Sequence, residues 1–272
     1  MKEIQPDTSD SFVYSCSSAE MWGYEQFVPE HVLAFQASGE THIFHQNGTL
    51  ILKKGQLMLA RKNQFAKSFK TPANDGEYKA FSVILKAEDL QKYAAQQQID
   101  IAKKYEGDSN IVLASDAFLE SYFQSLFPYL NHPGKGSEHM TFSKIAEAIA
   151  LILNNDPSLE SFLFDFVEPY KINLEAFMEK NYQYNASIEN FAKLTGRSLA
   201  AFKRDFKAQF RTTPAKWLKN KRLEEAYYLI HQKNRKSADI YLDLGFENLS
   251  HFYTAFKDKY GMTPTQSLTQ QK

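Results

Sequence analysis

Apolar and polar residues follow one another in short, strand-like stretches over roughly the first third of the chain. His31–His45 is typical of two strands with a turn near Ser38-Gly39, and Thr49–Ala60 of two more that turn at Lys54-Gly55. Glu77–Lys86 is rich in β-branched and aromatic residues and follows a run of turn-forming residues. Strands this closely spaced predict a small antiparallel β barrel or sandwich.

After Lys86 the apolar residues recur at intervals of three and four, which predicts helices. We expect helices over Ala87–Gln98, Asp116–Leu130 and Met140–Leu153, with a break at Asn131–Ser137. The second helix carries a wide apolar stripe, made of Phe118, Leu119, Tyr122, Phe123, Leu126, Phe127 and Leu130. The last two helices should form a hairpin that either covers the barrel or serves as a dimerisation surface.

The last hundred residues read as helical throughout, and one segment occurs there twice, fifty residues apart. The copies are "SLAAFKRDFKAQFRTTP", which begins at Ser198, and "NLSHFYTAFKDKYGMTP", which begins at Asn248. Aromatic residues four apart share one face of a helix; here they are Phe202, Phe206 and Phe210 in the first copy, and Phe252, Phe256 and Tyr260 in the second. Ser198 and Asn248 are suitable N-caps for these helices, and the Thr-Pro pairs that close both copies suit the starts of the next ones.

Each copy therefore predicts a short helix, a turn that contains Gly196 or Gly245, and a second helix with a buried aromatic edge. This is the helix-turn-helix pattern, whose second helix can lie in the major groove of DNA. A period of fifty residues also occurs in solenoids, but solenoids need about three or more copies for stability. Two linked helix-turn-helix units are the better interpretation.

The face of each second helix opposite its aromatic residues is the predicted DNA-binding surface. It consists of Ser198, Ala200, Lys203, Arg204 and Lys207 in the first copy, and Ser250, His251, Thr254 and Lys257 in the second. Arg204 suits a bidentate pair with guanine, and the lysines suit phosphate. The alternative for each residue is a solvated surface side chain.

The formal net charge of zero conceals an asymmetry between the two parts of the chain. Residues 1–169 carry 14 Lys and Arg against 22 Asp and Glu, and residues 170–272 carry 18 against 10. A basic C-terminal module beside an acidic N-terminal one favours a polyanionic partner for the basic part. Charge alone leaves open a merely solvated basic surface.

The C-terminal segment resembles the AraC-type (AraC/XylS) bacterial transcription regulators from about Ile172 to Gln266. The resemblance rests on "LTGRSLAAFKRDFK", "TPAKWLKNKRLEEAYYLI" and "DIYLDLGFENLSHFYTAFKDKYGMTP". The family usually has Ala where this chain has Tyr241, and Gly where it has Phe210. The N-terminal half resembles the sensor domains of the family, which are small cupin-like barrels followed by helices.

This resemblance implies a sequence-specific transcription regulator, more specifically an activator, that binds double-stranded promoter DNA and works with RNA polymerase. It further implies control through the N-terminal domain by a small-molecule effector, a protein partner or homodimerisation. The expected fold is α+β with two domains. Residues 1–160 form the β-barrel sensor or dimerisation domain with its helices, residues 161–171 the linker, and residues 172–272 the DNA-binding domain.

Two other classes of protein remain as alternatives, a cupin-like metal or sugar enzyme with a helical appendage and a non-specific nucleic-acid-binding protein. On a strand, Glu40 and His42 share one face and His45 points the other way, which disfavours a two-histidine metal site. The chain has no G-x-S-x-G, phosphate-loop or dinucleotide motif, so we expect no catalysis, cofactor or metal. The barrel either encloses an effector pocket, with Phe35, Phe44 and Phe81 among its lining, or is packed solid.

The single cysteine, Cys16, fits a reducing compartment. The first residues lack the apolar core of a signal peptide, and the longest apolar run, "AIALIL" from Ala148, is far shorter than the roughly 18 residues that span a bilayer. We therefore expect a cytoplasmic, nucleoid-associated protein without membrane contact.

Overall fold

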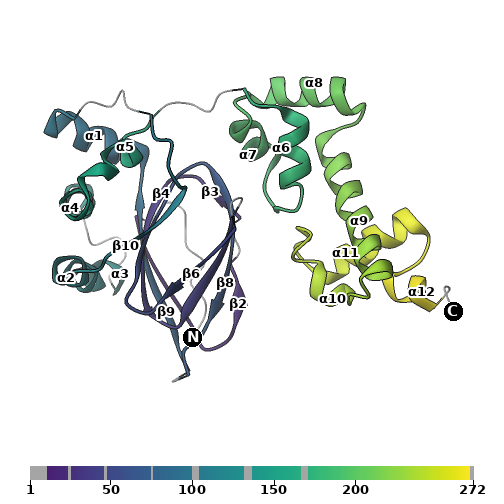
Figure 1. Ribbon diagram of the computed structural model, residues 1–272, viewed down its shortest axis with the longest axis horizontal. Coiled ribbons are helices and arrows are strands. Elements are labelled where there is room, and N and C mark those ends of the chain that lie inside the picture. Colours follow the sequence, from purple (N-terminus) through teal and green to yellow (C-terminus); the bar gives the residue numbers. More distant parts are fainter. Residues whose placement is uncertain are drawn as a thin grey trace. The chain divides into compact units, whose positions relative to one another are not determined.

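The computed structural model describes residues 11–23, 26–45, 48–74, 76–99, 104–131, 137–166 and 171–269. The chain divides into two compact units, Met1–Val167 and Glu168–Lys272. The first contains both β-sheets, and the described residues of the second are helical apart from their connecting turns (Figure 1).

The strands of the N-terminal unit form two antiparallel sheets. The first sheet has the order β1 (Phe12–Ser17), β9 (Tyr78–Leu85), β4 (His31–Ser38), β7 (Leu57–Ala60) and β10 (Asn110–Leu113). The second has the order β2 (Met21–Trp22), β8 (Gln64–Thr71), β5 (Glu40–His45) and β6 (Gly48–Lys53), and β3 (Phe27–Val28) also pairs with β8. The inner faces of the two sheets enclose a small barrel-like space, so the predicted fold class is confirmed.

The predicted turns at Gly39 and Gly55 lead from one sheet to the other. β4 lies in the first sheet and β5 in the second. β6 also lies in the second sheet, and β7 returns to the first. Gly39 has a φ of 75°, and a Cβ atom there would lie 2.4 Å from the carbonyl oxygen of Thr71. Because no other residue type fits without moving this backbone, Gly39 fixes the first crossing between the sheets.

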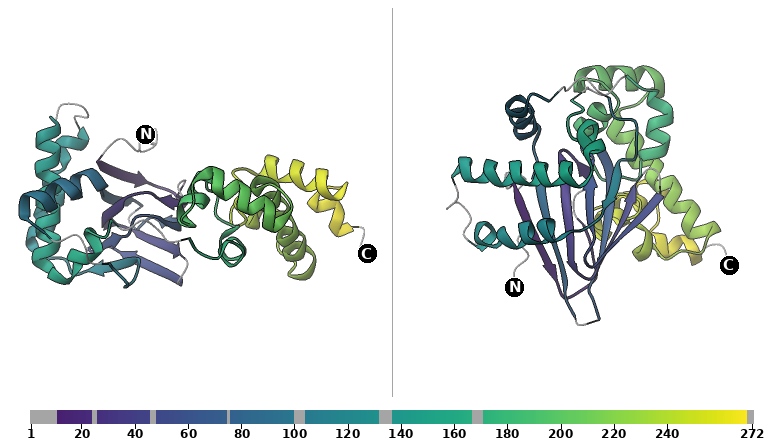
Figure 2. Two further views of the ribbon diagram at one scale, coloured as in Figure 1. Left: turned by 90° about the horizontal axis from the view of Figure 1, so that it is seen from above. Right: turned by 60° about the vertical axis from the view of Figure 1, so that its left-hand side comes forward.

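Helices cover the outer face of the first sheet, on one side of the unit (Figure 2). They are α1 (Ala87–Gln97), α2 (Ala117–Ser125), α3 (Phe127–Asn131), α4 (Glu138–Asn155), the short 3-10 helix η1 (Pro157–Leu159) and α5 (Glu160–Leu163). The main core lies between the helices and the sheet, where Leu33, Leu59 and Val83 of the strands meet Leu119, Ile149 and Phe162 of the helices.

The predicted helix over Asp116–Leu130 is instead two helices, α2 and α3. Pro128 explains the break, because it lacks an amide hydrogen and its ring would clash with the carbonyl group four residues earlier. The predicted apolar stripe is also narrower than expected. The side chains of Phe118 and Phe127 are 71% and 42% exposed, whereas Leu119, Tyr122, Phe123 and Leu126 are buried.

Residues 162–164, which the sequence analysis places in the linker, belong to the N-terminal core. Phe162, Leu163 and Phe164 are buried there, and the chain divides only after Val167. Aromatic residues at the end of this unit therefore help to close its core.

The C-terminal unit contains α6 (Leu174–Asn181), α7 (Ile188–Leu194), α8 (Leu199–Phe210), α9 (Pro214–Gln232), α10 (Ser237–Ile240), α11 (Leu249–Tyr260) and α12 (Pro264–Thr269). The pairs α7–α8 and α10–α11 are the two helix-turn-helix units, and the long helix α9 joins them (Figure 1). Gly196 and Gly245 lie in the two turns with positive φ of 65° and 79°.

Candidate nucleic-acid interface

The aromatic edge of α8 anchors this helix in the C-terminal unit. Phe202 and Phe206 are fully buried, with ring centroids 5.6 Å apart, and Phe210 stacks on Phe206 at 4.3 Å. Trp217 of α9 packs edge-on against Phe206 at 5.8 Å. These contacts fix which side of α8 faces the protein and leave the opposite side exposed.

Helix α11 is anchored in the same way. Phe252 and Phe256 are fully buried with centroids 5.9 Å apart, and Tyr260 packs on Phe256 at 4.6 Å. The Tyr260 hydroxyl donates to the carbonyl oxygen of Leu223 in α9 at 3.2 Å, and Tyr227 of α9 lies 4.9 Å from the Tyr260 ring. Helix α9 thus packs against both reading helices, through Trp217 against α8 and through Leu223 and Tyr227 against α11.

Side-chain caps start the helices at the positions that the sequence analysis names. The Ser198 side chain accepts from the Ala201 amide at 3.3 Å, and the Asn248 side chain accepts from the His251 amide at 2.8 Å. Thr213 caps α9 in the same way. The caps satisfy amides that have no partner inside the helix, and they determine which residue begins each exposed face.

All nine residues of the predicted DNA-binding surface are exposed. They are Ser198, the N-cap of α8, then Ala200, Lys203, Arg204 and Lys207 on α8, and Ser250, His251, Thr254 and Lys257 on α11. The exposed surface of α8 carries three cations, and the corresponding residues of α11 include one lysine. The first helix therefore has the stronger electrostatic attraction for a polyanion, while the second offers mostly neutral polar groups.

Asp205, in the middle of α8, pairs with one of these cations. Arg204 is 74% exposed and pairs with Asp205 Oδ1 through Nη2 at 3.1 Å. The other oxygen, Oδ2, lies 3.0 Å from Lys171 Nζ and 3.2 Å from Arg197 Nε. The hydrogen bond from Lys171, followed by those from Arg197 and Arg204, lowers the pKa of Asp205 to about 2. Asp205 is therefore ionised at neutral pH, and its Oδ1 pairs with the exposed Arg204. The repeated segment does not reveal this cluster around Asp205, because the partners Lys171 and Arg197 precede it in the sequence.

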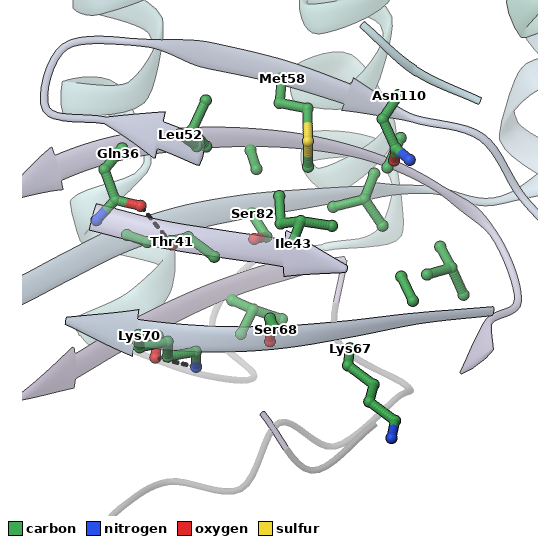
Figure 3. Close-up of a pocket in the computed structure, with 18 of the residues that line it drawn as sticks. Gln36, Thr41, Ile43, Leu52, Met58, Lys67, Ser68, Lys70, Ser82 and Asn110 are labelled. Atoms are coloured by element: carbon green, nitrogen blue, oxygen red, sulfur yellow. Dashed lines mark hydrogen bonds between the residues drawn. The ribbon is translucent and has the colours of Figure 1, made fainter. Parts of the chain in front are cut away.

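The inner faces of the two sheets enclose a second candidate site, a cavity of about 230 Å³ (Figure 3). Small and apolar side chains form much of its wall, among them Ala34, Ile43, Leu52, Met58, Ala60, Ala80 and Ser82. The side chains of both sheets alternate in direction, so every second residue of β4 and β9 reaches this space.

One group of polar side chains lines one part of the cavity wall, while Lys67 and Asn110 line another part (Figure 3). Thr41 donates to Gln36 Oε1 at 2.7 Å and lies 2.8 Å from the Tyr78 hydroxyl. Lys70 Nζ donates to Ser15 Oγ at 2.8 Å and lies 5.5 Å from the centre of the Tyr78 ring. Burial raises the pKa of Tyr78, which keeps its hydroxyl protonated and able to donate. The cavity thus combines an apolar wall with a polar, cationic patch.

The three phenylalanines expected in the pocket lie elsewhere. Phe35 stacks on Phe123 at 5.1 Å, and Phe81 contacts Phe127 at 5.0 Å, so both face the helices on the outer side of the first sheet. Phe44 packs against Trp22 at 5.6 Å on the second sheet. Strand alternation places their smaller neighbours inward, and none of the three lines the cavity.

The histidines of β5 do not form a metal site with their neighbours. His42 Nε2 lies 3.5 Å from Glu40 Oε2, which places the two side chains on one face as expected. Across the described ranges, no three His, Cys, Asp or Glu side chains come together in a way that could hold a metal ion. Similarly, no helix within the part of the chain that the structure describes is long and apolar enough to cross a membrane.

Comparisons with known proteins match both units. Residues 191–270 match a family described as a helix-turn-helix domain, and residues 31–162 match the ExsA N-terminal regulatory domain. The HTH-type transcriptional regulator ExsA of Pseudomonas aeruginosa is 24% identical over 238 residues, which cover 84% of this chain and 82% of that protein. The virulence regulon transcriptional activator VirF of Yersinia enterocolitica is 30% identical over 94 residues, 35% of either chain.

A solved structure of ToxT from Vibrio cholerae aligns with 96% of this chain and 98% of its own, at 13% identity and a TM-score of 0.43. The regulatory domain and the helix-turn-helix domain match side by side in one chain, in the same order as the two units of the structure. The two matches identify the chain as a DNA-binding transcription regulator with an N-terminal regulatory domain and an AraC-type helix-turn-helix domain.

Proposed function

We propose that this DNA-binding regulator activates transcription from promoters at which α8 and α11 enter two neighbouring segments of the major groove. The observation that carries the proposal is the matched construction of the two helices. Each is pinned by two buried phenylalanines, capped at its first residue, and exposed along the opposite face. A helix held in this way can present its side chains to base edges without rearranging its own core.

The chemistry of the exposed faces supports different tasks for the two helices. Arg204, paired with Asp205, suits the two acceptors of guanine, and Lys203, Lys207 and Lys257 suit phosphate. Ser250, His251 and Thr254 offer short polar groups, which suit contacts to bases or to phosphate. We infer that α8 supplies the greater part of both affinity and base discrimination.

The test is selection of bound fragments from a pool of random duplexes with the full chain. The expected result is a motif with two conserved segments about 10 base pairs apart, because equivalent groups recur once per turn of DNA. Affinity for the recovered site should fall with rising salt as counterions are released. Equal affinity for scrambled duplexes would overturn the proposal and favour a non-specific nucleic-acid-binding protein.

Activation is tested with the recovered site placed upstream of a reporter gene. We propose that the bound regulator recruits RNA polymerase in the cytoplasm, beside the nucleoid, and that reporter output rises when the protein is expressed. A fall in reporter output with an intact site would make the protein a repressor. The double variant Phe206→Ala and Phe256→Ala removes one buried ring from each reading helix. It should abolish the change in reporter output, whether that change is a rise or a fall.

We further propose that the cavity of the N-terminal unit takes a small effector that is mainly apolar and carries hydrogen-bond acceptors at one end. Its volume of about 230 Å³ suits a small molecule, and Gln36, Thr41, Tyr78 and Lys70 supply the polar patch. A screen of such compounds against the full chain should yield a ligand that raises the melting temperature of this unit.

Filling the cavity provides the control for this part of the proposal. Ala80→Leu projects a larger side chain into the cavity and should remove the ligand-induced shift. Val112→Leu adds one methylene on the exposed part of β10, where the side chain is 43% exposed, and should leave the shift unchanged. If Ala80→Leu folds and still shows the full shift, the ligand binds elsewhere.

Pairing of two copies is the remaining element of the proposal. Phe118, Phe127 and Met140 leave apolar surface exposed on α2, α3 and α4. Sedimentation of the full chain should show a dimer that Phe118→Ser weakens; a monomer at micromolar concentration would rule this element out without affecting DNA binding by one chain.

A further inference from the structure

Arg222, in the middle of α9, holds backbone groups from two separate parts of the C-terminal unit. Its Nε donates to the carbonyl oxygen of Tyr182 at 2.7 Å, and its Nη2 donates to that of Tyr184 at 2.7 Å. Its Nη1 donates to the carbonyl oxygen of Gly245 at 3.1 Å. The first two residues follow α6, beside the first helix-turn-helix unit, and the third lies in the turn of the second unit. One guanidinium therefore joins the two halves to each other.

The backbone of the second turn lies directly against the chain that follows α6. A Cβ atom on Gly245 would lie 2.7 Å from the carbonyl oxygen of Gln183 and 3.0 Å from Arg222 Cζ. Gly245 also has a φ of 79°, which disfavours other residues. The absence of a side chain at this position lets the guanidinium and both backbone segments meet in one place.

The chemistry of the contact suits a rigid joint. Arg222 is half-buried, and loss of solvation lowers its pKa to about 10, so it remains charged at neutral pH. Its planar fork of donors points in fixed directions, and charge-assisted bonds to three carbonyl groups leave the two segments little freedom to turn against each other. The Tyr182 carbonyl lies at the C-terminal end of α6, where the helix dipole also favours a cation.

Two ion pairs between described residues each connect one half of the unit to α9. Lys221 of α9 pairs with Glu179 of α6 at 2.6 Å, and Lys259 of α11 reaches Glu224 and the Asn220 carbonyl of α9, each at 2.9 Å. These contacts hold one unit on the connecting helix. Arg222, by contrast, contacts both units from the same side chain.

We propose that Arg222 is a positioning residue that fixes the separation and relative rotation of α8 and α11, and so sets the spacing between DNA segments that the protein accepts. This inference rests on the proposed function. Adding one base pair between two segments moves the second by about 3.4 Å and rotates it by about 34°, which a rigid pair of reading helices cannot follow.

The first experiment measures binding of the full chain to the selected site and to sites with one base pair added or removed between its two segments. We expect the unaltered protein to lose at least about tenfold in affinity at either altered spacing. In Arg222→Met, the ratio of the affinity at the selected spacing to the affinity at an altered spacing should fall towards one. The reason is that affinity drops at the selected spacing and hardly changes at the others. Lys219→Met removes an exposed cation from the same helix and should leave the ratio unaltered, whatever it does to affinity.

The second experiment needs no DNA, so it separates failure of this inference from failure of the proposed function. Spin labels on cysteines introduced at the exposed positions Ala208 and Asp258, with Cys16→Ser, report the distance between α8 and α11 by pulsed electron resonance. The distance distribution should be narrow in the otherwise unaltered chain and broader with Arg222→Met.

Circular dichroism establishes whether each variant is folded. If Arg222→Met unfolds, both measurements are made on Arg222→Lys, which keeps the charge but has a single ammonium in place of the fork and should also broaden the distances. A folded variant that keeps both the narrow distribution and the spacing ratio would overturn the inference. A broad distribution in the unaltered chain would do so as well, because no fixed separation would then exist.

Discussion

Arg211 and Gly261 occupy equivalent positions at the ends of α8 and α11, and both have left-handed backbone, with φ of 56° and 74°. Each donates its amide to the carbonyl oxygen four residues earlier, Lys207 in one case and Lys257 in the other. The family pattern has a glycine where this chain has Phe210, but the residue that adopts the left-handed backbone is Arg211. The first helix thus ends with a strained arginine where the second has a glycine.

This difference predicts that Arg211→Gly stabilises the C-terminal unit. Left-handed backbone costs a non-glycine residue roughly 1–2 kcal/mol, and the greater freedom of glycine in the unfolded chain offsets about half of this. We expect the free energy of unfolding to rise by about 0.5–1 kcal/mol. Urea unfolding followed by Trp217 fluorescence, in a Trp22→Phe background, measures it.

The reverse change provides the control. Gly261→Arg meets no atom within 4 Å of its new Cβ, so only backbone strain opposes it, and it should destabilise the unit by a similar amount. A loss of stability in Arg211→Gly would show that the exposed arginine makes a contribution larger than the strain.

Phe206→Ala should destabilise the C-terminal unit severely. The Phe206 ring is fully buried and contacts Phe202, Phe210 and Trp217, so its removal leaves a cavity and costs about 3–5 kcal/mol. The control is Tyr228→Ala in the same unit, whose ring is 45% exposed and whose removal should cost less than about 1 kcal/mol. Equal effects of the two substitutions would contradict the assignment of Phe206 to the core.

His31 makes the stability of the N-terminal unit sensitive to acid. Burial, followed by the nearby cations Lys62 and Arg61, lowers the pKa of His31 from 6.5 to about 3. Between these values the unfolded chain binds a proton that the folded chain excludes, so stability falls as the pH falls from 6.5 towards 3, at up to about 1.4 kcal/mol per pH unit.

Replacing His31 tests this dependence. His31→Phe keeps a ring beside Phe162, whose centroid lies 5.1 Å from that of His31, and should reduce the slope of stability against pH in this window. Unfolding is followed by Trp22 fluorescence in a Trp217→Phe background. An unchanged slope would assign the acid sensitivity of the unit to its carboxylates.

Arg204→Ala should reduce discrimination at one or two base pairs of the selected site by about 1–3 kcal/mol. Binding is measured on the selected duplex and on single-base variants of it. Lys203→Ala, on the same helix, should weaken binding by similar factors on all of these duplexes. It should also reduce the slope of log affinity against log salt concentration by about 1, the value for one phosphate contact. A uniform loss in Arg204→Ala would make Arg204 a phosphate contact too.

The sequence predicts the helix-turn-helix units well because their determinants are local. Aromatic residues four apart place Phe202 and Phe206 on one face, and the caps at Ser198 and Asn248 mark where the reading helices begin. Period, cap and turn glycine all lie within about twenty residues of one another, so no knowledge of distant contacts is needed.

The sequence predicts the barrel interior poorly because alternation does not reveal which face of a strand is enclosed. Phe35 and Phe81 looked like pocket lining, but the helices bury these large rings on the other face, and small residues such as Ala34 turn inward. Arg222 was missed for a related reason. Its partners lie about 20 to 40 residues away and are backbone carbonyl groups, which leave no pattern in the side chains.

Strand β9 carries consecutive side chains that belong to different environments. Ala80 and Ser82 border the enclosed space, and Phe81 between them contacts Phe127 of α3 on the far side of the sheet. Because successive side chains of a strand point to opposite faces, this one strand forms part of the cavity wall and part of the contact with the helices. A molecule that pushed β9 outward would therefore press Phe81 against α3.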